Sequence, residues 1–380
     1  MPWEITLELP SSWRMWNVKE ISVLLPPPEC TAVGGRDASR ESPSREGAPR
    51  AGAWIETYAL FWARRQGMWR EGCDEHGTWR ALFAENEIAG GGLEAFQDVK
   101  GGETMSFLHL PRTDVELHYE EFGRGKLLLA VHGCSPDHRL MTGCLEPVFA
   151  QRLGWRRIYV DLPGMGKTPG RPDLASSDRI LEVLLEFLDL AAPGESFAAA
   201  GESYGGYLVQ GIVRERCENV LGALLLCPTV EQKKDRRALP KHLLSWEDAD
   251  LEEYLTVDER REFASCTVVR TRWNWERFGR EIFSGIRCAD GEFLKRLTEE
   301  RREFRAPADR AEPFWGPSLF IAGRQDGMVG YADLFPLLER YPRASLAVLD
   351  RAGHNLQIEQ PRLFEELVAE WLFRMESGAC

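Results

Sequence analysis

Short apolar runs alternate with amphipathic segments along the chain from residue 105 onward. The apolar runs predict strands that are buried on both faces, as in a parallel sheet, and they lie at 126–131, 157–160, 198–200, 221–227, 318–322 and 345–349. The segments between them carry apolar residues at helical spacing and lie at 140–152, 178–190, after 204, 330–339 and 361–375. This alternation predicts an α/β fold with a mostly parallel central sheet flanked by helices.

Two segments depart from this alternation. Segments 106–110 and 115–122 predict an antiparallel hairpin that opens the sheet. Segment 230–312 is charged, helix-like and rich in aromatic residues, and it separates two core strands. An insertion at this point lies above the carboxyl ends of the strands, where open α/β sheets bind ligands. We therefore expect a helical lid over about 230–312.

The first 104 residues show no sustained helical or strand period. Segment 26–50 is rich in Pro, Gly, Ser and Arg, which predicts a disordered linker, and 54–85 favours a helix that ends before the glycines at 90–92. We expect 1–104 to be a largely irregular extension and 105–380 to be the main domain.

The functional protein is expected to begin at Met105. The residues Lys-Gly-Gly-Glu-Thr before Met105 can be encoded by a purine-rich ribosome-binding sequence a few nucleotides upstream of ATG, as at a bacterial start. The competing hypothesis is an N-terminal domain whose tryptophans pack on the main domain or recruit a partner.

Composition narrows the class of partner and the compartment. The 380 residues carry a net charge of −13, and a strongly acidic chain is a poor partner for nucleic acid or an anionic membrane. The nine cysteines are odd in number and include no C-x-x-C, which favours reduced thiols in the cytoplasm over disulfides or a zinc site. No secretion signal or membrane-spanning run is present in the sequence. We expect a cytoplasmic protein that acts on a small molecule, without a metal or cofactor; the oligomeric state stays open.

The most informative stretch is the turn after the strand at 198–200, which reads Gly201-Glu-Ser203-Tyr-Gly205. The pattern G-x-S-x-G is that of the nucleophile elbow, in which a serine is held on a sharp strand-to-helix turn with its hydroxyl exposed. Glycines flank the serine because the strand and the helix approach too closely for a Cβ. The pattern alone also fits an ordinary Gly-rich turn.

Two more ionisable residues follow strands on the same edge of the predicted sheet. Asp326 comes after the strand at 318–322, and His354 comes after the strand at 345–349. The chain order Ser203, Asp326, His354 is that of a Ser-Asp-His triad. In such a triad the histidine takes the serine proton and the carboxylate fixes the imidazole tautomer. Glu231, after the strand at 221–227, is the weaker alternative for the acid.

Taken together, these motifs resemble the α/β-hydrolase superfamily over residues 105–380. The matching pieces are His132-Gly133, Asp161-x-Pro-Gly-x-Gly, the elbow, Gly323-x-x-Asp326-x-x-Val329, and Gly353-His354 followed by Glu359-x-Pro361. Within this superfamily, the combination of these motifs with a lid is most similar to lidded esterases and carbon–carbon-bond hydrolases of small molecules. The resemblance also implies an oxyanion hole made by the backbone N–H groups of Cys134 and Tyr204. The oxyanion segment His-Gly-Cys-Ser-Pro departs from that of proline iminopeptidases, which argues against a peptidase.

We therefore hypothesise a serine hydrolase that cleaves a small apolar acyl compound of ester type through an acyl-enzyme. The alternatives are a carbon–carbon-bond hydrolase or an acyltransferase on the same site, and a non-catalytic binding protein of the same fold. Trp273 and Trp275 in the insertion are the candidate pocket residues, although lid aromatics more often pack helices.

The remaining polar residues are assigned structural roles. His132 is expected to brace the oxyanion segment, Asp161 to form a turn before Leu-Pro-Gly, and His138 to lie on the surface. The segment Asp161–Thr168 is one residue short of a phosphate loop. Asp161 stands in place of its first glycine and Pro163 lacks a donor, so we do not expect nucleotide binding.

Overall fold

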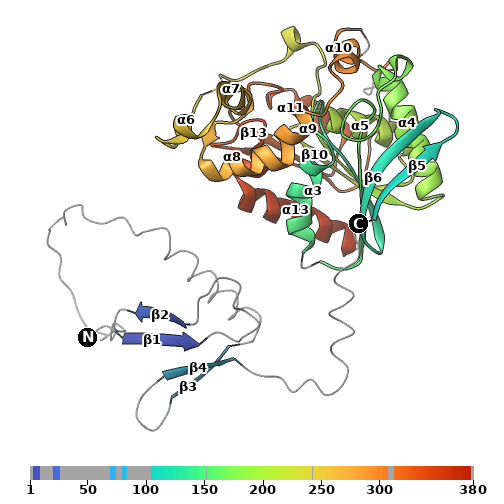
Figure 1. Cartoon of the computed structure of the whole chain (residues 1–380). Coiled ribbons are helices and arrows are strands. Elements are labelled where there is room, and N and C mark those ends of the chain that lie inside the picture. The colour runs from blue at the N-terminus through green and yellow to red at the C-terminus, as the bar shows by residue number, and fades with distance from the viewer. Residues whose placement is uncertain are drawn as a thin grey trace. The chain divides into compact units, whose positions relative to one another are not determined.

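The computed structural model describes residues 104–377, apart from 151, 242, 301 and 307–311, and four strands before them. These four strands are β1 (Trp3–Glu8), β2 (Glu20–Leu25), β3 (Trp69–Cys73) and β4 (Trp79–Phe83). The chain divides into two compact units, Met1–Val99 and Lys100–Cys380. Figure 1 labels the strands of the first unit and the sheet and helices of the second.

The first unit contains two antiparallel strand pairs. β1 pairs with β2, and β3 pairs with β4, with Trp69 opposite Phe83 and Cys73 opposite Trp79. The helix predicted over 54–85 is therefore wrong for 69–73 and 79–83; its remainder and the linker at 26–50 lie outside the described residues. Of the aromatic residues around which this helix was expected, Trp69 begins β3, and aromatic side chains are also favoured in strands.

The second unit is built on an eight-stranded sheet of order β14-β13-β10-β9-β7-β8-β6-β5. Its strands are β5 (Thr104–Leu110), β6 (Val115–Gly123), β7 (Lys126–Val131), β8 (Trp155–Val160), β9 (Phe197–Glu202), β10 (Val220–Leu226), β13 (Ser318–Gly323) and β14 (Ala344–Leu349). β5 and β6 form the predicted antiparallel hairpin, and β6 also runs antiparallel to β8. The pairs from β8 to β14 are parallel, so the predicted mostly parallel sheet is confirmed.

Each face of the sheet carries its own hydrophobic core, because side chains alternate along a strand. In β7, Leu127 and Leu129 belong to the core shared with α4 (Ser177–Ala191) and α5 (Tyr204–Arg216). Leu128 and Ala130 belong to the other core, shared with α3 (Arg139–Phe149) and α13 (Pro361–Glu376). The sheet is thus covered by helices on both faces. The helix predicted over 330–339 is shorter than expected: α11 (Leu334–Leu337) is followed by the 3-10 turn η6 (Leu338–Arg340).

The insertion between β10 and β13 is mainly helical, as predicted. Its elements are η3 (Lys234–Arg236), β11 (Trp246–Glu247), α6 (Leu251–Tyr254), α7 (Val257–Cys266), β12 (Val269–Arg270), α8 (Arg272–Phe278), the π-helical turn η4 (Gly279–Phe283), α9 (Ser284–Ile286) and α10 (Gly291–Glu300). Figure 1 shows α6, α7, α8 and α9 grouped together in yellow and orange. Phe263, Trp275 and Phe278 pack together at its centre. Among the described residues, no helix has the length and apolar character needed to cross a membrane.

Candidate active site

The elbow has the strained geometry that its sequence predicts. β9 ends at Glu202 and α5 begins at Tyr204, so Ser203 alone makes the turn, with φ 51° and ψ −113°. A Cβ at Gly205 would lie 2.1 Å from the carbonyl oxygen of Val131, and a Cβ at Gly201 would lie 2.4 Å from the backbone of Gly205. Only glycine fits at these two positions, and the close packing holds Ser203 in a conformation that non-glycine residues rarely adopt.

Asp326 and His354, which follow β13 and β14, form a direct pair. The Nδ1 atom of His354 lies 2.8 Å from Oδ2 of Asp326, and the other carboxylate oxygen accepts the N–H groups of Met328 and Val329. Burial disfavours both charged forms, but mutual attraction outweighs it: the pKa of Asp326 is lowered and the pKa of His354 is raised to about 9. His354 and Ser203 line the same cavity. Glu231, the alternative acid, accepts a hydrogen bond from the N–H of Lys233.

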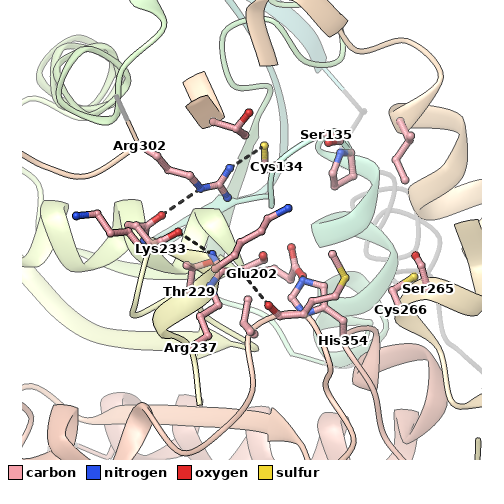
Figure 2. A pocket seen from close by; sticks show the side chains of 18 of the residues that line it. Cys134, Ser135, Glu202, Thr229, Lys233, Arg237, Ser265, Cys266, Arg302 and His354 are labelled. Atoms are coloured by element: carbon pink, nitrogen blue, oxygen red, sulfur yellow. Dashed lines mark hydrogen bonds and ion pairs between the residues drawn. The ribbon is translucent and has the colours of Figure 1, made fainter. Parts of the chain in front are cut away.

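Glu202 is a neighbour of His354 that the sequence analysis did not identify. Its side chain is 2% exposed, and Oε1 lies 3.3 Å from Nε2 of His354. Burial raises the pKa of Glu202 to about 7, opposed by the attraction of His354. Both side chains line the cavity and are labelled in Figure 2. The residue occupies a variable position of G-x-S-x-G, so the motif carries no signal for it.

The oxyanion segment follows β7 and lies against the loop after β8. His132 shares a hydrogen bond of 2.7 Å between Nδ1 and the carbonyl oxygen of Gly133, and its Nε2 accepts the N–H of Leu162 at 3.0 Å. Burial lowers the pKa of His132, consistent with a neutral, bracing imidazole. Cys134 lines the cavity next to Ser203. Tyr204 is the first residue of α5, and N–H groups at this end of a helix lack intrahelical partners.

The cavity has a volume of about 1100 Å³ and is lined by both apolar and polar side chains. The apolar lining includes Leu140, Phe278, Ile282, Ile286 and Val329. The polar lining includes Gln232 and the cations Lys233, Arg237 and Arg302, together with the carboxylates Asp178, Asp235, Glu262, Glu299 and Glu303. Trp273 and Trp275 are not among the lining residues: Trp273 is 65% exposed, and Trp275 is buried against Phe263, Phe278 and Phe283. The insertion thus contributes Phe278 and Phe304, rather than its tryptophans, to the cavity.

Two arginines of the insertion face the cavity with neutral partners. Arg302 donates to Oε1 of Gln232 at 3.1 Å and lies 3.5 Å from the sulfur of Cys134, as Figure 2 shows. Arg237 donates to the carbonyl oxygens of Glu231, Gln232 and Met328. Burial and the charge of Arg302 lower the pKa of Arg237. Neither guanidinium forms an ion pair with a carboxylate within the described part of the chain, so both remain able to bind an anion.

A second histidine–carboxylate cluster lies behind the oxyanion segment. Asp161 is fully buried and contacts Nδ1 of both His118 and His138, each at 2.8 Å. The predicted surface position of His138 is wrong: the residue is 5% exposed, and its Nε2 lies 3.0 Å from Glu120. Asp161 does shape its loop, accepting the N–H of Lys167 at 2.9 Å, but it also anchors two imidazoles.

This second cluster also has the residue types of a metal site. The ligand atoms of His118, His138 and Asp161 gather within 4.8 Å of one another. Both Nδ1 atoms, however, are already bonded to Asp161, and the ammonium group of Lys167 lies 3.4 Å from Nε2 of His118. A metal cation would have to displace these bonds and face a positive charge.

Comparison with known proteins places this architecture in a family. Residues 128–367 match the Alpha/beta hydrolase family. The chain belongs to this family. The matched region runs from β7 to α13 and includes the elbow, the insertion and the loops that carry Asp326 and His354.

The individual relatives fall into two activity classes. One is a 2-hydroxy-6-oxononadienedioate/2-hydroxy-6-oxononatrienedioate hydrolase from Burkholderia vietnamiensis, 27% identical over 268 residues that cover 69% of this chain and 92% of the relative. Another is a pimeloyl-[acyl-carrier protein] methyl ester esterase from Aeromonas salmonicida, 26% identical, covering 66% of this chain and 96% of the relative. Among solved structures, an alpha/beta superfamily hydrolase from Oenococcus oeni superposes with a TM-score of 0.65 at 26% identity, covering 72% of this chain and 99% of that one.

Proposed function

We propose that the protein is a serine hydrolase in which Ser203, His354 and Asp326 act as a triad. The observation that carries this proposal is the 2.8 Å pair of Asp326 and His354, beside a cavity that the strained Ser203 also lines. Asp326 orients the imidazole through Nδ1, which leaves Nε2 for proton transfer. A serine hydroxyl is a weak nucleophile unless a base takes its proton. In this proposal, His354 is the base that makes Ser203 reactive.

The proposed reaction has two halves. His354 takes the proton of Ser203 as its oxygen attacks the acyl carbon, and the oxyanion that forms is held by the N–H groups of Cys134 and Tyr204. The imidazolium then returns the proton to the leaving group, which gives an acyl-enzyme and a free alcohol. Water attacks the acyl-enzyme by the same sequence and releases the acid. If an alcohol or amine replaces water, the same site performs acyl transfer.

The substrate that we propose is a small ester whose acyl group packs against the apolar side chains that line the cavity. Leu140, Phe278 and Ile282 provide this surface. The methyl ester esterase from Aeromonas salmonicida is consistent with this class of substrate.

A second candidate is carbon–carbon-bond hydrolysis of a compound that carries a carboxylate. It is favoured by Arg237 and Arg302, which face the cavity without carboxylate partners among the described residues. The Burkholderia relative hydrolyses a dienedioate by its name, and its similarity supports this candidate. The two candidates share the triad and differ in the leaving group. The carbon–carbon hydrolase also needs cationic side chains in the cavity that bind the carboxylate of its substrate.

Labelling with a fluorophosphonate probe tests the triad. We expect stoichiometric labelling of the native protein at Ser203, none in Ser203→Ala, and slow labelling in His354→Ala. Absence of labelling in the folded native protein would instead support a non-catalytic binding role.

A substrate panel separates the two candidates. It would contain p-nitrophenyl esters of graded chain length, each with and without a terminal carboxylate, and a diketone in the same two forms. Preference for neutral esters supports the esterase. Preference for the anionic diketone, lost in Arg302→Gln, supports carbon–carbon hydrolysis.

A further inference from the structure

The carboxylate of Glu202 occupies an unusual place, between the oxyanion segment and the proposed base. It accepts a hydrogen bond from the N–H of Gly133, and its Oε1 lies 3.3 Å from Nε2 of His354. Glu202 is the last residue of β9, and its buried side chain is among those that line the cavity. The mechanism proposed above assigns it no task.

The contact falls on the one imidazole atom that must exchange a proton with Ser203. Asp326 already holds Nδ1 at 2.8 Å, so a protonated His354 lies between two carboxylates. Once His354 is neutral, its Nε2 presents a lone pair, and an ionised Glu202 faces that lone pair without a proton to share. Glu202 therefore favours the imidazolium over the neutral base.

The remaining groups around this pair do not provide the same effect. The charge of Arg237 opposes protonation of His354. Glu359 is a further buried carboxylate in this region: it accepts the N–H of Gly353, the residue before His354, and burial raises its pKa to about 7. Among the described residues, no hydrogen bond or ion pair joins it to the His354 imidazole. The remaining titratable neighbours are thiols, whose charged forms burial disfavours: Cys227 beside Asp326 and His354, Cys266 whose carbonyl accepts the N–H of His354, and Cys144 near Glu202. Glu202 and Asp326 are the two carboxylates that contact His354 among the described residues.

A purely structural role for Glu202 would not require a carboxylate. A glutamine has the same shape, and its carbonyl oxygen would accept the N–H of Gly133 equally well. Burying an ionisable carboxylate is costly unless a charged partner compensates. The compensating partner here is the His354 imidazolium.

We propose that Glu202 is a positioning residue that acts through His354, holding the imidazolium by Nε2 and so setting the pH above which Ser203 is activated. The proposal rests on the proposed function of the Ser203–His354–Asp326 triad. It implies two opposite effects. Glu202 delays the formation of neutral His354 as the pH rises, and it stabilises the imidazolium that forms once Ser203 has transferred its proton.

The test is the pH profile of fluorophosphonate labelling of the full-length chain, from pH 5 to pH 10. It compares the native protein with Glu202→Gln, Glu202→Asp and the control Glu231→Gln, and each variant is first checked by circular dichroism. We expect the acid limb of Glu202→Gln to move down by about one pH unit, so that on this limb its labelling, relative to its own plateau, is about tenfold faster. Its plateau at high pH should be lower than that of the native protein. Glu231→Gln should reproduce the native profile.

The aspartate variant keeps the charge and withdraws it by one methylene group, so its acid limb should move in the same direction by a smaller amount. If Glu202→Gln does not fold, this shift carries the test. A uniform loss of labelling at all pH values with an unmoved midpoint would overturn the proposal and assign Glu202 a structural role. Failure of the native protein to be labelled at any pH would overturn the proposed function itself, which is a different outcome.

Discussion

Two histidine–aspartate clusters lie in the same unit and share their central contact. In each, an imidazole Nδ1 meets a buried aspartate at 2.8 Å: His354 with Asp326 in one, His138 with Asp161 in the other. They differ at the opposite ring nitrogen. Nε2 of His354 lies in a cavity beside Ser203 and Glu202, whereas Nε2 of His138 is closed off by Glu120.

The difference shows that a buried histidine–aspartate pair does not by itself make a catalytic site. A proton relay needs an Nε2 that opens onto a cavity, a nucleophile that lines the same cavity, and room for a substrate. The Asp161 cluster lacks these features. It ties β6, the start of α3 and the loop after β8 together through bonds from His118, His138 and Lys167 to Asp161. We therefore expect its loss to lower stability, and the loss of the Asp326 pair to lower activity.

The largest expected effect is that of Asp326→Asn on activity. An asparagine keeps the shape but no longer stabilises the imidazolium or its tautomer, so kcat should fall by about 10³–10⁴-fold. The measurement is the steady-state hydrolysis of the best ester from the substrate panel, with Glu231→Gln as the matched control. An active Asp326→Asn variant together with an inactive Glu231→Gln variant would reassign the acid to Glu231.

Asp161→Asn should act on stability instead. Removing one partner from a buried charged cluster leaves His118 and His138 without their anion, which should lower the free energy of unfolding by about 3–5 kcal/mol. Chemical denaturation monitored by tryptophan fluorescence gives this quantity, and the molecules that remain folded should label with a fluorophosphonate within a factor of ten of the native rate. A stable protein that has lost its labelling would place Asp161 in the catalytic machinery.

The contribution of His138 to the free energy of unfolding should depend on pH, because its imidazole is charged at low pH and neutral at high pH. Burial opposes its protonation, but Asp161 and Glu120 outweigh this and raise its pKa from 6.5 to about 9. A raised pKa means that the stabilisation is complete below about pH 6.5 and disappears as the pH rises through 9. The difference in unfolding free energy between the native protein and His138→Gln should therefore shrink from pH 6 to pH 10, by on the order of a few kcal/mol. A difference that does not change with pH would show that His138 is neutral in the folded protein.

The smallest expected effect is that of Glu120→Gln. The variant removes the charge next to Nε2 of His138, at a site where the glutamate side chain is 16% exposed. The loss should be about 1–2 kcal/mol of stability at pH 7, because a hydrogen bond to a charged group is weakened but not removed. Thermal unfolding measures it, with Glu116→Gln on the same strand as an exposed control. A change in the pH profile of Ser203 labelling would show that the two clusters are coupled.

The sheet and the polar residues at its edge could be predicted because each depends on local sequence. A serine between glycines after a short strand, and Asp326 and His354 after two later strands, need only the strand positions to be placed on one edge. The sequence could not predict contacts formed by distant segments. Arg302 reaches Cys134 across 168 residues of chain, and the burial of His138 depends on Glu120 in β6 and Asp161 in the loop after β8. The helix predicted over 54–85 is wrong for 69–73 and 79–83, because aromatic residues such as Trp69 favour strands as well as helices.

The close approach around Gly205 has a consequence for engineering this protein. A methyl group at this position would lie 2.1 Å from the carbonyl oxygen of Val131, so the elbow cannot be altered without moving the strand that precedes the oxyanion segment. A mutagenesis library directed at residues 201–206 would therefore consist mostly of inactive clones. The same library directed at Leu140, Phe278, Ile282 and Ile286, whose side chains line the cavity from α3 and the insertion, would explore new acyl groups while leaving the reacting atoms in place.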